Sequence, residues 1–291
     1  MVHTPKCHFC PVCDGRGCIG ELPGMGGVFE NYNFIANCTE WKILAGRFSR
    51  DNRLAAQALP AVRLAPITGG TQNVGYADEQ TFYEDLISGC IDAGMELSIG
   101  DGYPDEKLQF GIQALRSRGA KAAVFMKPYP NEHLFERLEW AHDVAQIVGV
   151  DIDAYNIVTM RNLAQLECKT AADLRELRSR AGVPFAVKGV FTAADIQLVR
   201  ELKPDIVVVS NHGGRVETGR GSSAAFLETH GPELKNYCGE LWVDGGLRTA
   251  DDLAAAAILG ASTVLIARPI ITALLRDGPA GIKRWKKDFY G

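Results

Sequence analysis

A histidine and an arginine, three residues apart, stand directly after a short apolar run, and their types suit chemistry on an acidic ligand. The run is Ile206–Val209, and the segment after it reads SNHGGR, with His212 and Arg215. If the run is a buried strand, the side chains beyond its carboxyl end leave the core and converge on a ligand. A histidine there can move a proton near neutral pH, and an arginine can hold an anion by paired hydrogen bonds. The segment therefore predicts proton transfer beside a bound anion.

Short apolar runs alternate with segments of helical periodicity from residue 60 onward. The runs cover 61–67, 95–99, 122–126, 148–157, 184–187, 206–209, 241–243 and 263–266, and the helical patterns include 79–93, 131–147, 193–202 and 250–259. Apolar strands separated by amphipathic helices are typical of a parallel sheet that is buried on both faces. Eight such units predict an α/β fold, a closed (β/α)8 TIM barrel. An open doubly wound sheet is the alternative, but no GxGxxG motif opens a helix after the first strand.

Four of the eight cysteines lie within twelve residues near the amino terminus. In a reducing compartment, such a cluster predicts a metal centre rather than disulfides. Closely spaced thiolates can bind an iron–sulfur cluster, whereas zinc usually recruits two separated pairs, so we favour iron–sulfur slightly over zinc. An unligated cysteine-rich tail is the remaining possibility. We expect a Cys-rich extension and lead-in over residues 1–59 and the barrel over 60–291. The predicted ligands are Cys7, Cys10, Cys13 and Cys18.

The composition restricts the class of protein. With 46% hydrophobic and 23% charged residues, the chain is typical of a soluble globular protein with a large core. The formal net charge of -4 argues against general nucleic-acid binding, which requires a basic surface. No apolar run approaches the roughly 20 residues that span a bilayer, and the amino terminus has no apolar signal region. We therefore expect a cytoplasmic protein without a membrane span.

Polar residues stand at the carboxyl ends of several predicted strands, where a barrel gathers its functional groups. Lys188 ends the fifth strand and would point into the barrel mouth. The seventh and eighth strands are followed by DGGLR (244–248) and ARP (267–269). Barrels usually hold a phosphate at these two loops, and glycine amides together with Arg248 and Arg268 suit that ligand. The sequence thus predicts a phosphate site at this side of the mouth.

Four motifs in register make the chain resemble the FMN-dependent α-hydroxy-acid dehydrogenases and oxidases. They are PFAVKG (184–189), SNHGGR (210–215), DGGLR and ARP. The resemblance is strong over residues 181–273 and weaker over 30–156. It implies FMN as the cofactor, a small 2-hydroxy acid as the substrate and a homo-oligomeric assembly.

The resemblance also implies a role for each matching residue. His212 would be the base that takes a proton from the substrate, Arg215 would clamp the substrate carboxylate, and Lys188 would stabilise charge on the reduced flavin. Tyr129 would be an active-site tyrosine. The remaining positions implied to bind the cofactor are Thr68, Ser98, Lys127, Asn156, Ser210, Asp244, Gly245, Gly246, Arg248, Ala267 and Arg268.

Several positions depart from the family pattern. Lys127 stands where the family has a glutamine, and Ala267 replaces the glycine of its GRP motif. After the fourth strand the family has Thr-x-Asp, whose aspartate pairs with the catalytic histidine. A count from residue 149 puts Asn156 at the threonine and Val158 at the aspartate, and a shift of register would let Asp151 or Asp153 supply the carboxylate. One further candidate for substrate binding is Arg161.

The expected function is FMN-dependent oxidation of a small 2-hydroxy acid to the 2-oxo acid. The cysteine cluster replaces the region of the family's amino-terminal active-site tyrosine. This difference favours a non-oxygen electron acceptor, such as a partner protein or a quinone. Two alternatives stay open. One is a redox-neutral FMN barrel enzyme similar to type 2 isopentenyl-diphosphate isomerase, and the other is a non-catalytic flavin- or metal-binding module.

Overall fold

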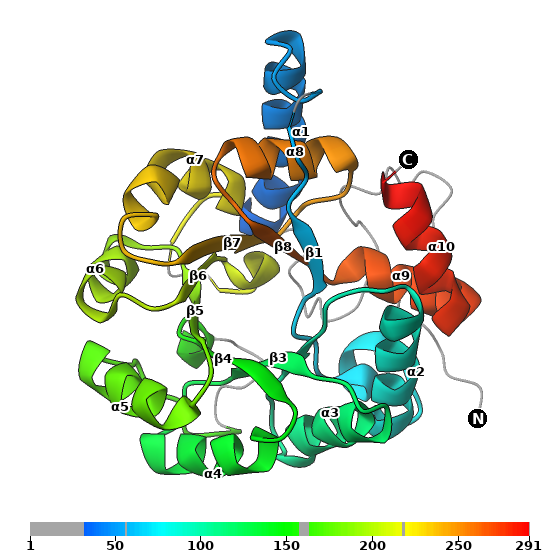
Figure 1. Cartoon of the computed structure of the whole chain (residues 1–291), viewed down its shortest axis with the longest axis vertical. Helices are drawn as coiled ribbons and strands as arrows, with labels where there is room; N and C mark the ends of the chain where they lie inside the picture. Colours follow the sequence, from blue (N-terminus) through cyan, green and yellow to red (C-terminus); the bar gives the residue numbers. More distant parts are fainter. Residues whose placement is uncertain (1–31, 56, 157–162, 217–218, 291) are drawn as a thin grey trace.

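Eight parallel strands close into a barrel in this computed structural model, which describes residues 32–55, 57–156, 163–216 and 219–290. A parallel bridge between Arg63 and Glu96 links β1 to the segment before β2, which joins the two ends of the sheet. The predicted (β/α)8 barrel is confirmed (Figure 1). The sheet order is β1-β8-β7-β6-β5-β4-β3-β2. The strands are β1 (Ala61–Leu64), β2 (Ser98–Gly100), β3 (Ala122–Met126), β4 (Ala145–Asp151), β5 (Phe185–Val190), β6 (Ile206–Val209), β7 (Glu240–Asp244) and β8 (Thr263–Ile266).

Helices surround the barrel and alternate with its strands (Figure 1). Three of them begin with a Thr-x-x-Asp capping box, which gives partners to N–H groups that the first helical turn leaves unpaired. Each box therefore fixes the residue at which its helix begins. The helices after β1 are α2 (Glu79–Asp92), α3 (Glu106–Ser117), α4 (Asn131–Ala141), α5 (Ala171–Ala181), α6 (Ala193–Leu202), α7 (Ser223–Leu234), α8 (Ala250–Ile258), α9 (Arg268–Asp277) and α10 (Pro279–Tyr290).

One further helix, α1 (Tyr32–Arg50), precedes the barrel and packs against α7, α8 and the turn after β6. Its apolar face, which includes Phe34, Trp41 and Phe48, is buried. The helix belongs to the predicted lead-in, whose cysteine cluster lies outside the described residues. The four predicted metal ligands therefore stay a prediction.

The boundary between α4 and β4 differs from the expectation. The helical pattern predicted a helix over 131–147, but α4 ends at Ala141 and β4 already begins at Ala145. The predicted strand over 148–157 ends at Asp151 instead. Backbone pairing explains the shift, because Ala145 pairs with Ala122 of β3 and Asp151 pairs with Lys188 of β5. Tertiary pairing overrides the local helical periodicity here.

The barrel interior is filled by side chains that alternate in size. Phe125 and Trp242 are almost fully buried among smaller residues such as Ala123 and Ala186. Gly149 makes room for the phenyl ring, since a Cβ at this position would lie 2.6 Å from the ring of Phe125. This core packs directly beneath the side chains at the carboxyl ends of the strands.

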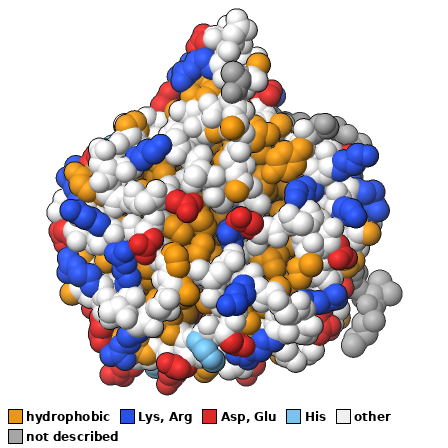
Figure 2. All heavy atoms as spheres, viewed as in Figure 1, with side chains coloured by type: hydrophobic (Ala, Val, Ile, Leu, Met, Phe, Trp, Pro, Cys, Tyr) orange, Lys and Arg blue, Asp and Glu red, His pale blue; other side chains and the backbone are white. Residues whose placement is uncertain are grey.

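The outer surface is of the kind expected for a globular protein. Hydrophobic side chains gather toward the middle of one face, and charged side chains lie mostly around its periphery (Figure 2). Within the described part of the chain, no helix has the length and apolar character needed to cross a membrane.

Candidate active site

A cavity of about 460 Å³ opens at the carboxyl ends of the strands. Each of the eight strands contributes to its wall, either directly or through the loop that follows. Its volume lies in the range of small-molecule binding sites, and this end of a barrel is where such sites occur. The lining residues that sequence reasoning selected are Thr68, Lys127, Asp151, Lys188, His212, Arg215, Asp244, Gly245, Gly246, Arg248, Ala267 and Arg268.

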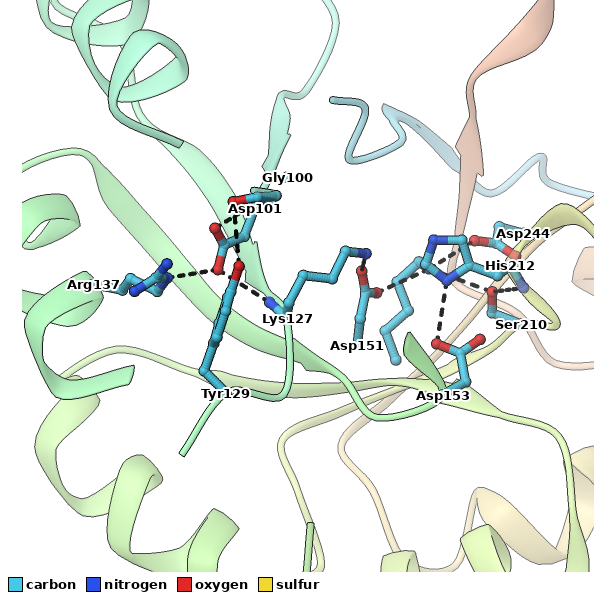
Figure 3. A network of polar contacts seen from close by, with 12 residues as sticks. Gly100, Asp101, Lys127, Tyr129, Arg137, Asp151, Asp153, Ser210, His212 and Asp244 are labelled. Carbon is cyan, nitrogen blue, oxygen red and sulfur yellow. Dashed lines mark hydrogen bonds and ion pairs between the residues drawn. The ribbon is translucent and has the colours of Figure 1, made fainter. Parts of the chain in front are cut away.

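Asp151 lies between two buried lysines at the end of β4. Its Oδ2 is 2.7 Å from Nζ of Lys127 (Figure 3), and its Oδ1 is 3.0 Å from Nζ of Lys188. Burial alone would raise the pKa of Asp151, but the two positive charges outweigh burial and lower it. Burial would also lower the pKa of Lys188, whereas Asp151 and Asp244 raise it above its usual value. These charges therefore persist on the cavity wall at neutral pH.

His212 faces the cavity from the turn after β6. Its Nδ1 lies 3.2 Å from Oδ1 of Asp153 (Figure 3). A carboxylate accepts hydrogen bonds, so Nδ1 carries the hydrogen and Nε2 keeps a lone pair. Burial, followed by the charges of Lys127 and Lys188, lowers the pKa of His212, and Asp153 opposes this only in part. The imidazole is consequently neutral near neutral pH and can accept a proton at Nε2.

The partner of this imidazole is Asp153, one of the two carboxylates that the sequence left open. β4 ends at Asp151, so Asp153 lies two residues beyond the end of the strand. The count that assigned Asn156 and Val158 to the Thr-x-Asp positions assumed a strand that runs to residue 157, which is too long, and the role of Asn156 in cofactor binding stays a prediction. Asn156 instead ends a short 3-10 helix beyond β4. Val158 and Arg161 lie outside the described residues.

Arg215 supplies a partly buried cation close to the histidine along the chain. It lines the cavity and follows the 3-10 turn His212–Gly214. Burial lowers the pKa of Arg215 to about 10, so the guanidinium stays charged at neutral pH. Its planar group can bind a carboxylate through two parallel hydrogen bonds.

Two further arginines line the cavity beside the loops after β7 and β8. Arg248 follows the pair Gly245 and Gly246, and Arg268 is the first residue of α9. The Nη2 of Arg268 also lies 3.4 Å from the carbonyl oxygen of Gly213, next to the histidine turn. A helix start with adjacent arginines suits a phosphate. The predicted phosphate residues are thus brought together.

Tyr129 does not line the cavity, although it was predicted as an active-site tyrosine. Its hydroxyl donates to the carbonyl of Gly102 (3.3 Å), and the guanidinium of Arg137 lies 4.1 Å from its ring centre. Burial raises the pKa of this phenol. The structure thus places Tyr129 beside the cavity, and its role as an active-site tyrosine stays a prediction.

Sequence reasoning missed Asp101, which is buried and lines the cavity. Its carboxylate accepts from the Gly102 N–H (2.8 Å), the Lys127 N–H (3.2 Å) and Nε of Arg137 (2.9 Å). It holds the loop that carries Lys127 (Figure 3). The available signal was an aspartate between two glycines directly after a predicted strand.

Ser98 and Ser210 lie beside the cavity and do not line it. Ser210 accepts from the His212 N–H (3.1 Å), and its Oγ lies 3.4 Å from Nζ of Lys188. Within the described residues, the buried Oγ of Ser98 has no hydrogen-bond partner, and neither has Oδ1 of Asp244. Buried polar atoms normally have partners, so the unpartnered Oδ1 of Asp244, which lines the cavity, points to a polar ligand.

Asp151, Asp153 and His212 also offer ligand atoms within 4.8 Å of one another, which could suit a metal ion. However, the charges of Lys127 and Lys188 already balance Asp151. A metal cation at this place would be repelled by both lysines. The arrangement favours a hydrogen-bonded base over a metal site.

The fold and the site together define a (β/α)8 barrel whose mouth holds a histidine–aspartate pair and three arginines, Arg215, Arg248 and Arg268. The family model described as FMN-dependent dehydrogenase matches residues 114–287, which is more than half of the chain. The chain belongs to the FMN-dependent dehydrogenase family.

Curated relatives match over a shorter stretch. Glycolate oxidase 3 of Oryza sativa subsp. indica is 37% identical over 112 residues, which cover 38% of this chain and 30% of that protein. The 4-hydroxymandelate oxidase of Amycolatopsis orientalis is 32% identical over 115 residues, which cover 40% and 32%. The match thus spans about a third of the length of these relatives.

Solved structures agree in fold. A mandelate oxidase variant with benzoyl-formic acid has a TM-score of 0.68 and 19% identity, covering 93% of this chain and 88% of that one. A mandelate oxidase variant with a monooxide FMN adduct has a TM-score of 0.64, again at 19% identity, covering 89% and 84%. At this identity the likeness supports the barrel fold alone.

The residues of the cavity fit FMN. The flavin mononucleotide has a flat polar ring and a phosphate. The unpartnered Oδ1 of Asp244 can bond one of its polar groups, and Arg248 and Arg268 can neutralise the phosphate.

Proposed function

We propose that this protein binds FMN and oxidises a small 2-hydroxy acid to the 2-oxo acid. One observation carries the proposal. The unprotonated His212, oriented by Asp153, shares a cavity with the cations Arg215 and Lys188. A base beside a carboxylate-binding arginine suits removal of a proton from a hydroxy acid.

The cofactor would be held by residues at the carboxyl ends of β5, β7 and β8. Arg248, Arg268 and the loop amides at Gly245 and Gly246 would bind the phosphate. Lys188 would lie beside the ring, where its charge can stabilise negative charge in the reduced state. When bound, FMN supplies an acceptor for the two electrons that the hydroxy acid loses.

His212 takes one of the two protons that the substrate loses. Its Nε2 accepts the proton while Nδ1–H donates to Asp153, so the new imidazolium is stabilised by a carboxylate already in place. Arg215 binds the substrate carboxylate and thereby orients the hydroxyl-bearing carbon toward the base. Both groups are partly buried on the wall of the cavity.

Spectroscopy of the purified protein tests the proposal. Under anaerobic conditions, a panel of 2-hydroxy acids should bleach the bound FMN. The variant His212→Ala should bind FMN but be reduced at least about 100-fold more slowly, the usual contribution of general-base catalysis. An exposed histidine at the end of α4 provides the control, since His142→Ala should react like the parent.

Three results would contradict the proposal. If His212→Ala is reduced as fast as the parent, the base is assigned wrongly. If no hydroxy acid bleaches the bound FMN, the redox-neutral isomerase-like function takes its place. A protein that binds no FMN would exclude both flavin-dependent functions.

The electron acceptor is part of the same proposal. The matched relatives are named as oxidases, which favours dioxygen over the partner protein or quinone expected from the cysteine cluster. The reduced protein should therefore be reoxidised rapidly by air-saturated buffer and release hydrogen peroxide. Slow reoxidation in air, together with iron in a metal assay, would favour the cysteine-linked acceptor.

We also propose that the protein assembles as a homo-oligomer, as the family resemblance implies. Light scattering after size-exclusion chromatography measures the mass directly. A mass of 31.6 kDa, that of one chain, would contradict the assembly.

A further inference from the structure

Helix α1 lies outside the stretch matched by the family model, yet it contacts the turn that carries the proposed base. We infer that Asn37 of α1 is a positioning residue that fixes the His212 turn through Asn211. The inference builds on the proposed function, because His212 is its proposed base.

Asn37 and Asn211 form a pair of reciprocal hydrogen bonds. Nδ2 of Asn37 donates to Oδ1 of Asn211 (2.7 Å), and Nδ2 of Asn211 donates to Oδ1 of Asn37 (3.1 Å). Both side chains are 1% exposed. Neither amide can be turned around, because the Ser223 N–H donates to Oδ1 of Asn37 and the Gly214 N–H donates to Oδ1 of Asn211. The pair therefore has one orientation.

Asn211 transmits this orientation to the catalytic turn. It stands immediately before His212, and its side chain caps the 3-10 turn at Gly214. His212 itself has a φ of 56°, in the left-handed region that residues other than glycine rarely adopt. Such a backbone conformation persists only where the surroundings enforce it. The bond from Asn37 is one of the contacts that enforce it.

Two motif glycines allow α1 to approach this closely. A Cβ at Gly214 would lie 2.6 Å from the backbone N of Phe34, and a Cβ at Gly246 would lie 2.1 Å from the carbonyl O of Asn37. Both glycines also have positive φ angles, 89° and 90°. The glycines of SNHGGR and DGGLR thus serve the contact with α1 as well as any contact with a ligand.

The same helix reaches the loops proposed to hold the phosphate. Nε1 of Trp41 donates to the carbonyl of Gly245 (2.8 Å), and the ring of Phe34 lies 4.7 Å from the guanidinium carbon of Arg268. Asn37 therefore contacts the turn that carries the proposed base, and Trp41 contacts the loop proposed to bind the phosphate. One helix would set the relative position of both.

The two contacts allow a test that separates positioning from general stability. Asn37→Asp keeps the acceptor for the Ser223 N–H but replaces the donor to Asn211 with an oxygen. We expect flavin reduction at saturating hydroxy acid to slow by at least about 10-fold, or about 1.4 kcal/mol, with FMN affinity within about 3-fold of the parent. Trp41→Phe should give the opposite pattern, with weaker FMN binding and near-normal reduction. The control on the same helix is Ile43→Ala, because Ile43 is 60% exposed.

A second measurement does not depend on turnover. The imidazole NMR signal of His212, assigned by its loss in His212→Asn, should titrate at higher pH in Asn37→Asp, because a loosened turn is less desolvated. Asn37→Ser, a smaller change, should shift the signal in the same direction if Asn37→Asp does not fold. An unchanged reduction rate together with an unchanged titration would overturn the inference. If instead no hydroxy acid reduces the parent, the proposed function fails, and the NMR titration still tests the positioning.

Discussion

Removal of the carboxylate between two buried lysines should destabilise the protein strongly. Asp151→Asn keeps the size of the side chain but leaves Lys127 and Lys188, which are 7% and 2% exposed, without their shared counter-charge. Breaking a buried ion pair by removing one partner costs about 3–5 kcal/mol. For a domain of this size, a loss of that order lowers the midpoint of thermal unfolding by about 6–20 °C.

Urea unfolding followed by circular dichroism measures this loss. The control is Asp143→Asn, because Asp143 pairs with Arg116 at the surface, where ion pairs contribute little to stability. The double variant Lys127→Met/Asp151→Asn should recover part of the loss, since it removes one of the uncompensated cations. If Asp151→Asn unfolds at the same urea concentration as the parent, the account of this network is wrong.

The same network predicts a pH dependence. The pKa of Asp151 is lower in the folded protein than in the unfolded chain, so its contribution is present above the ordinary pKa of aspartate, about 3.9. The contribution is lost as the pH falls through and below that value. The difference in stability between the parent and Asp151→Asn should therefore shrink below about pH 4. A difference that stays constant down to strongly acidic pH would contradict the lowered pKa.

Three further predictions concern the cavity and the core. Arg215→Lys should raise the KM for a hydroxy acid by about 10- to 100-fold in steady-state assays, because an ammonium cannot make the paired bonds of a guanidinium. The rate of flavin reduction should be constant from neutral pH to about pH 6.5 and fall at lower pH, since burial and the two lysines lower the pKa of His212; in Lys127→Gln the fall should begin at higher pH. Phe125→Ala should cost about 3–5 kcal/mol in urea unfolding, because it empties the centre of the barrel.

Local patterns were sufficient for most of the barrel. The apolar runs at 122–126, 206–209 and 263–266 coincide with β3, β6 and β8. Lys188 lies at the mouth as expected, because it follows a run of buried residues within a strand. The bounds of β4 could not be found in this way. The first residues of the strand also fit a helical pattern, and only pairing with β3 and β5 determined where the strand starts and ends.

The sequence by itself determined the fold class and the chemical types at the site, because strand periodicity, turn residues and motif order are local properties of the chain. The tertiary structure decided which groups meet. It placed Asp153 against His212, two lysines on Asp151, and Asn37 against Asn211, a contact across 174 residues of sequence. Such contacts depend on how helices and strands pack around a common core, and no single segment carries that information. Residues far from His212 along the chain therefore set both the pKa and the orientation of this histidine.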